Sequence, residues 1–310
     1  LNPVVAKLSE QIMRHINQAA ALNSINLIAL CLLASDKQSL TRQELERQLE
    51  VYLNLQRMVP YHANVSLPEQ TPAQMIAHAA KMQKIQLATD SFGELVSLSP
   101  QHAVQMSYYR NNILHLFIIP ALLASAVLRQ QEQSQQQLLA MVEQLYGLLR
   151  HELFLYVPSI SNYSKQLLQQ LVQAGMLQQQ EQRFIAPPQH SREYFMLDLL
   201  AHNAEHTLQR YAMVFNLLHA HGPLQRSELE QQSQQLAQRL LTLHGINAPE
   251  YYDKNLFATL SQALKLEGYS QLDQDNRVRA TPELSKLATS VNLLLRNEVL
   301  QSIYSIMPRD

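Results

Sequence analysis

Two adjoining runs of residues decide the fold: Leu167-Leu-Gln-Gln-Leu-Val-Gln-Ala-Gly175 and Met176-Leu-Gln-Gln-Gln-Glu-Gln-Arg-Phe-Ile185. The first run is helical in composition and ends at a glycine, which readily adopts the left-handed conformation that stops a helix. The second run places polar residues between two arms that carry apolar ones, a pattern that favours a short β-hairpin. Together the two runs predict a helix followed directly by a hairpin.

The same order of elements occurs three times along the chain, with a period of roughly 90 residues. Each unit opens with a helix led by Ser, Thr or a polar cluster, and the three starts lie near Thr41, Ser134 and Gln225. Thr41 and Glu44 have the spacing of a capping box, in which each side chain satisfies a free amide at the helix start. The Ser-x-x-Glu spacing returns at 227–230 in the third unit.

The remaining elements of each unit follow from the same register. Second helices are expected over 74–84, 164–174 and 255–267, hairpins over 85–98, 176–185 and 269–278, and long helices over 101–128, 191–220 and 281–302. Helix, helix, hairpin is the order of a winged helix. Leu and Gln supply 94 of the 310 residues and Gly only 6, which favours helices.

We therefore expect a mainly α fold of three tandem winged-helix-like repeats, made of helices plus short β-hairpins and joined by long helices. The expected domains are 1–130, holding an N-terminal helix and the first repeat, then 131–222 for the second repeat and 223–310 for the third. The first residues, Leu1-Asn2-Pro3, lack an initiating Met and suggest a segment of a longer protein.

Composition and charge disfavour several functions. The net charge of −1 and the few Lys residues in the expected second helices disfavour nucleic-acid binding, so a structural or protein-contact use of the repeats is favoured. Cys31, the single cysteine, cannot form an internal disulfide and indicates a reducing compartment. The apolar run 113–128 is shorter than the about 20 residues that span a bilayer, so we expect a buried helix, with membrane-surface contact as the alternative.

The sharpest motif is His202-Asn-Ala-Glu-His206, which has the spacing of an inverted zinc-protease signature. Both His fall roughly opposite the apolar stripe of their helix, so a solvent-facing polar surface is favoured and no metal site is expected. The sequence also lacks a Gly-x-Ser-x-Gly elbow and any phosphate-binding glycine loop. No catalytic residue and no cofactor are therefore assigned.

Two polar segments remain as candidate sites. In the first, 107–115, the candidates for a substrate-facing or interdomain surface are Tyr109, Arg110, Asn111, Asn112 and His115. A guanidinium can bind a carboxylate or phosphate with two hydrogen bonds, or it can pair with a carboxylate of a neighbouring domain. In the second, 244–254, the candidates for an interdomain loop are His244, Asn247, Glu250 and Asp253, where Asp253 is expected to cap the next helix.

These segments carry a family resemblance. The runs 106–115, 208–212 and 243–250 closely resemble the carboxy-terminal region of bacterial membrane-bound glycerol-3-phosphate 1-O-acyltransferase, and the similarity covers essentially the whole chain. In that family the catalytic domain lies upstream and carries a His and an Asp separated by four residues, the His acting as general base on the glycerol hydroxyl. The fifth residue after each of the twelve His in this chain is neither Asp nor Glu.

The resemblance implies that the parent enzyme transfers a fatty acyl group from acyl carrier protein or coenzyme A to sn-glycerol 3-phosphate, the first step of phospholipid synthesis. It implies a non-catalytic role for this chain, at the cytoplasmic face of the bacterial inner membrane. The implied partners are the upstream acyltransferase domain, the acyl donor and the membrane surface, and not nucleic acid. A free-standing DNA-binding repeat protein and a protein-interaction scaffold are the alternatives.

Overall fold

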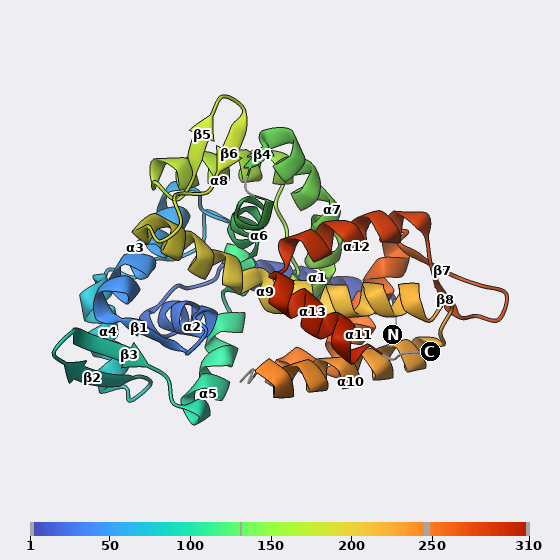
Figure 1. Cartoon of the computed structure of the whole chain (residues 1–310), viewed down its shortest axis with the longest axis horizontal. Coiled ribbons are helices and arrows are strands. Elements are labelled where there is room, and N and C mark those ends of the chain that lie inside the picture. The colour runs from blue at the N-terminus through green and yellow to red at the C-terminus, as the bar shows by residue number, and fades with distance from the viewer. Residues whose placement is uncertain (1–2, 131, 245–248, 308–310) are drawn as a thin grey trace.

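The computed structural model describes residues 3–130, 132–244 and 249–307, and the described chain is mainly helical (Figure 1). Two helices come first, α1 (Pro3–Gln18) and α2 (Ser24–Ala34). The next segment contains, in order, β1 (Ser39–Thr41), α3 (Arg42–Met58), α4 (Pro72–Lys81), β2 (Gln86–Asp90) and β3 (Gly93–Ser97). Its three strands form an antiparallel sheet in the order β1-β3-β2, with Leu40 opposite Val96.

The same order of strand, helix, helix and hairpin returns in the middle of the chain. It consists of β4 (Glu132–Ser134), α7 (Gln135–Leu153), α8 (Ile160–Gln173), β5 (Gln178–Gln180) and β6 (Arg183–Ile185), with sheet order β4-β6-β5. The last segment consists of α10 (Arg226–His244), the 3₁₀ turn η1 (Pro249–Tyr252), α11 (Lys254–Leu266), β7 (Ser270–Leu272) and β8 (Val278–Ala280). There an antiparallel bridge between Leu224 and Val278 stands in place of a leading strand.

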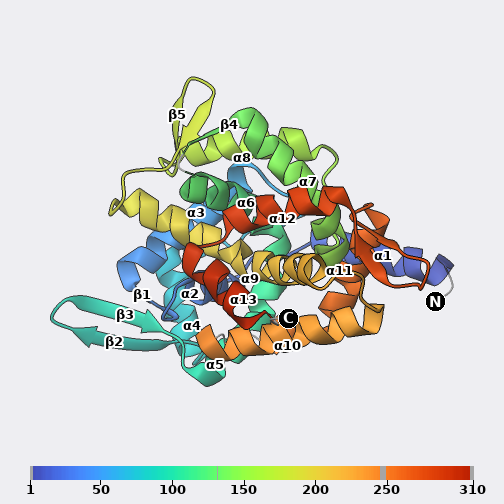
Figure 2. The ribbon, with the colours of Figure 1, turned by 45° about the vertical axis from the view of Figure 1, so that its right-hand side comes forward.

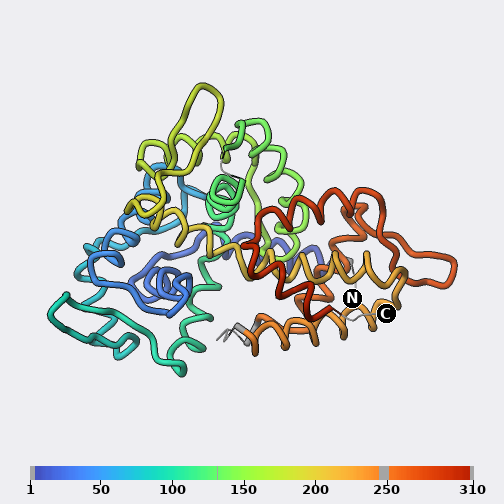
Figure 3. Tube along the Cα trace, in the orientation of Figure 1, coloured from blue at the N-terminus to red at the C-terminus, as the bar shows by residue number. Residues whose placement is uncertain are grey.

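The three hairpins lie at separate corners of the molecule (Figures 1 and 3). The helices α5 (Pro100–Asn111), α6 (Leu114–Gln130) and α9 (Arg192–Ala220) lie between the segments in the chain, and α12 (Pro282–Leu294) and α13 (Asn297–Ile306) follow the last one. α9 runs between the segments and packs against α6, α10 and α12, and the buried apolar residues of all three segments form one cluster.

Two of the three long helices predicted from the sequence are wrong as single helices. The predicted helix 101–128 is bent by 92° between α5 and α6, and the predicted helix 281–302 is broken between α12 and α13. The bend directs α6, buried from Leu114 to Leu128, into the centre of the molecule, while α5 stays at the surface. The third long helix, 191–220, is confirmed as α9.

The caps explain where several helices begin. The predicted box is confirmed at Thr41, whose side chain accepts from the Glu44 amide while Glu44 accepts from the Thr41 amide. Ser134 and Gln137 form the equivalent box at α7. The third unit opens near Gln225, as predicted, because α10 begins at Arg226; Ser227 lies inside the helix, so the Ser-x-x-Glu spacing there does not mark its start.

The apolar run over 113–128 is buried, as predicted, and Cys31 is fully buried in α2. No single helix among the described residues has the length and apolar character needed to cross a membrane. Taken together, α5 and α6 do pass that test of length and composition, although they form a sharply bent pair.

Candidate functional site

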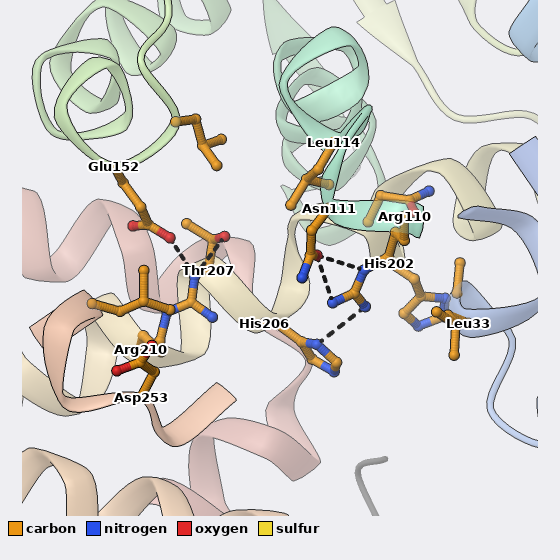
Figure 4. Close-up of a pocket in the computed structure, with 14 residues that line it drawn as sticks. Leu33, Arg110, Asn111, Leu114, Glu152, His202, His206, Thr207, Arg210 and Asp253 are labelled. Carbon is orange, nitrogen blue, oxygen red and sulfur yellow. Dashed lines mark hydrogen bonds and ion pairs between the residues drawn. The ribbon is translucent and has the colours of Figure 1, made fainter. Parts of the chain in front are cut away.

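A pocket of about 200 Å³ lies between helices from distant parts of the chain (Figure 4). It is enclosed by the end of α2, the junction of α5 and α6, the end of α7, the middle of α9 and the start of α11. Leu33, Leu114 and Leu256 contribute apolar walls, while α5 and α9 contribute most of the polar groups. Residues more than 140 positions apart in the chain therefore share one cavity.

Arg110 projects into this pocket from the last turn of α5 and is only 8% exposed. Its Nε and Nη2 donate to Oδ1 of Asn111 at 3.2 and 3.1 Å, and its Nη1 lies 3.5 Å from Nδ1 of His206 (Figure 4). The guanidinium at the end of α5 thus contacts the middle of α9 directly.

The surroundings of His206 favour its neutral imidazole form. Burial lowers its pKa well below the usual 6.5, and the positive charges of Arg110 and Arg210 lower the pKa further. Its ring meets the edge of Tyr251, with the centroids 5.2 Å apart. A neutral ring beside two guanidiniums can accept a hydrogen bond through one nitrogen and donate through the other.

The prediction that His202 and His206 face solvent is wrong. The side chain of His202 is only 9% exposed, and its ring nitrogens lie 3.7 Å from Asp198 Oδ2 and 3.4 Å from Glu205 Oε2. The single apolar stripe used for the prediction assumes one buried face, whereas α9 is covered on several sides by other helices. Among the described residues, no three His, Cys, Asp or Glu side chains are grouped to hold a metal ion.

The opposite end of the pocket holds a buried ion pair. Arg210 donates to the carboxylate of Glu152, and its Nη2 also lies 3.2 Å from the Thr207 hydroxyl, which accepts (Figure 4). Burial alone lowers the pKa of Arg210, but the Glu152 carboxylate more than offsets this and raises it overall. Neither residue was a candidate from the sequence, although Arg210 lies within one of the runs that carry the family resemblance.

The two polar segments singled out in the sequence meet at this pocket through Arg110, Asn111 and Asp253. Asp253 also caps α11, as predicted, by accepting from the Asn255 amide at 2.9 Å. Asn247 lies outside the described residues, as do the side chains of His244 and Glu250.

The other three candidates of the polar segment 107–115 lie elsewhere. Tyr109 and Asn112 are at the surface, where the ammonium of Lys84 lies 5.9 Å from the Tyr109 ring centroid. His115 is buried on α6, its Nε2 lies 3.0 Å from the Asn17 carbonyl oxygen, and burial lowers its pKa to about 4. The continuous run 109–115 is therefore divided by the bend between α5 and α6.

The pocket presents guanidinium and amide donors, two imidazoles and two carboxylates, Glu152 and Asp253. This set can hold a small polar or anionic group by hydrogen bonds. Among its described lining residues there is no serine or cysteine nucleophile, and the Thr207 hydroxyl accepts from Arg210. The arrangement is suited to binding or to joining segments.

Comparison with known proteins gives a consistent result. A family model described as the glycerol-3-phosphate acyltransferase C-terminal region matches residues 1–273. The chain is 43% identical over 303 residues to a glycerol-3-phosphate acyltransferase of Shewanella loihica and 41% identical over 304 residues to one of Shewanella putrefaciens. Each alignment covers 98% of this chain and 36% of the relative, so the chain spans about a third of the length of these curated relatives.

Proposed function

The chain belongs to the family of glycerol-3-phosphate acyltransferase C-terminal regions, and from this premise we propose that it is the non-catalytic C-terminal region of a glycerol-3-phosphate 1-O-acyltransferase. The full enzyme would transfer an acyl group from acyl carrier protein or acyl coenzyme A to sn-glycerol 3-phosphate and form lysophosphatidic acid. The observation that carries the proposal is the alignment itself, which covers almost all of this chain but only 36% of the relatives. The lack of a His followed five residues later by an acidic residue supports the non-catalytic role.

We propose that the three segments are winged-helix-like repeats used for contact between proteins. The order of strand, helix, helix and hairpin supports this, as does the pairing of β1 and β4 with their hairpins. The second helices α4, α8 and α11 carry few cations for phosphate contacts, which disfavours DNA as the partner. The domains 1–130, 131–222 and 223–310 follow from the same proposal.

The region would pack on the upstream acyltransferase domain and help the enzyme dock at the cytoplasmic face of the inner membrane or at its acyl donor. In this proposal the pocket around Arg110 and Asn111 is the interdomain or substrate-facing site. Its support is the convergence of buried polar groups from α5 and α9 on one cavity, a costly arrangement that is stable only when these groups are paired.

The test uses the full-length acyltransferase that contains this region and the 310-residue chain alone. We expect lysophosphatidic acid from the full-length protein and none from the chain alone. Lysophosphatidic acid made by the chain alone would refute the non-catalytic role. The rivals predict other results: a DNA-binding protein retards duplex DNA with steep salt dependence, and a scaffold captures acyl carrier protein without any upstream domain.

The role of the pocket has its own test. Arg110→Ala in the full-length enzyme should lower activity or solubility, whereas Arg183→Ala, at an exposed arginine in β6, is the matched control. If Arg110→Ala left both activity and solubility at the level of the control, the proposed role of the pocket would be wrong.

A further inference from the structure

The N-terminal helix α1 exposes a continuous apolar stripe. Val5, Leu8, Ile12 and Ile16 lie three or four residues apart, so they share one face, and their exposed fractions are 46%, 54%, 49% and 57%. Of the side chains from Val4 to Gln18, none is buried. Isolated apolar side chains at a surface are ordinary, but an ordered row of four along one helix marks an interaction surface.

α1 is held to the rest of the chain near its C-terminal end. Asn17 Nδ2 donates to the Leu153 carbonyl at 2.7 Å, the Asn17 carbonyl oxygen faces His115, and the Arg14 guanidinium lies 5.6 Å from the centroid of the Tyr156 ring. The first turns extend away from the body of the molecule (Figure 2). A helix of 16 residues is only marginally stable in water by itself, so its apolar face needs a partner to stabilise the first turns.

The opposite face of α1 is not that of a helix that lies in a membrane. Interfacial helices of that kind carry many Lys and Arg on the polar face and often Trp on the apolar one. Here Lys7 and Arg14 are accompanied by Glu10, which pairs with Arg14 at 2.6 Å, and the whole chain has no Trp. Two cations against one carboxylate leave α1 with a net charge of only +1, and this low charge favours a protein surface as the occupant.

The family match indicates which protein surface covers the apolar stripe of α1. The matched model is a C-terminal region and the relatives extend well beyond the alignment, so in those proteins a long segment precedes the part that corresponds to this chain. That segment is joined at the start of α1, and a domain tethered there has a high effective concentration at the stripe. We propose that the apolar stripe of α1 is the docking face for the acyltransferase domain that precedes this region. The inference rests on the proposed function and names the surface that performs it.

The experiment measures cysteine accessibility in the full-length acyltransferase. Ile12→Cys reports on the stripe, and Leu293→Cys in α12 is the matched control, because both are helical residues with nearly equal exposure, 49% and 51%. Native Cys31 is fully buried, and reactive cysteines elsewhere are first replaced. We expect a charged, water-soluble maleimide to label Ile12→Cys at least about tenfold more slowly than Leu293→Cys, since protein contact excludes the reagent.

A photocrosslinker on Ile12→Cys identifies what covers the stripe. Crosslinks to residues of the acyltransferase domain are the expected result. Equal labelling rates for the two cysteines in an active enzyme would overturn the inference while leaving the proposed function intact. Protection that needs added phospholipid vesicles, or that is lost on dilution, would overturn it in favour of lipid or a second copy. An inactive full-length protein that still protects Ile12→Cys would instead count against the proposed function.

Discussion

Arg210 in α9 and Glu152 at the end of α7 form a buried ion pair, with side chains only 8% and 6% exposed. The pair joins α7 to α9 and forms one end of the pocket. Glu152→Ala would leave a buried guanidinium without its carboxylate, so we expect the free energy of unfolding to fall by about 3–5 kcal/mol in urea titrations. The double variant Glu152→Leu with Arg210→Met removes both charges and should lose markedly less. Equal losses for the single and double variants would show that packing, and not the pair, holds this junction.

His115 makes stability depend on pH. Its folded-state pKa of about 4 lies below the unfolded value of about 6.5, so the unfolded chain binds more protons between these values. The stability contributed by neutral His115 is present above pH 6.5 and is lost as the pH falls towards 4. Between pH 7 and pH 5 we expect a loss of about 2 kcal/mol from this residue.

The check on His115 is urea unfolding of the chain and of His115→Gln at pH 7 and pH 5. The variant is expected to be less stable at pH 7, because it disturbs the contact with Asn17, but to lose about 2 kcal/mol less on acidification. An unchanged pH dependence in the variant would assign the acid sensitivity to other groups, with half-buried His206 the first to examine.

Gly147 faces Glu267 across the contact between α7 and α11. A Cβ at this position would overlap the Glu267 carboxyl group, whose Cδ lies 2.8 Å away, and that carboxylate accepts from Arg150 at 2.7 Å and lies 3.0 Å from His151 Nε2. We expect Gly147→Ala to change stability by less than about 1 kcal/mol, because the Glu267 side chain can shift and the weakening of its ion pair offsets the gain in helix propensity of about 1 kcal/mol. In a Glu267→Ala background the same change should stabilise the chain by about 1 kcal/mol, a difference that thermal unfolding can measure.

The capping boxes of α3 and α7 should contribute equally. Thr41→Ala and Ser134→Ala each remove a side chain that accepts an amide at a helix start, at a cost of about 1 kcal/mol. Ser290→Ala, at a partly exposed serine inside α12, is the control and should change stability by less than about 0.5 kcal/mol. If all three variants lost the same amount, the caps would not be specific determinants of these helices.

Local features of this fold were predictable from the sequence. The buried run over 113–128, the Thr41–Glu44 box and the cap at Asp253 depend on residues close together in the chain, and the structure confirms them. The bend after α5 was not predictable, because the helical periodicity of the sequence continues through Asn112. Only the need to bury α6 on every side turns the chain inwards there.

The candidate site was predictable only in part. Arg110, Asn111 and Asp253 were singled out and do line the pocket. Glu152 was missed because its partner Arg210 is 58 residues away in the chain, and no local sequence pattern predicts such a pair. The exposure of His202 was misjudged because a helix surrounded by other helices has no single polar face.

The continuity of α9 restricts how this chain can change in length. Over its 29 residues, an inserted or deleted residue would rotate everything beyond it by about 100° and shift it by about 1.5 Å. A deletion near Met213 would leave His206 in place but turn Leu217 and Leu218 away from their buried positions. Substitutions in α9 can be accommodated by local repacking, whereas insertions and deletions are better tolerated in the turns of the three hairpins.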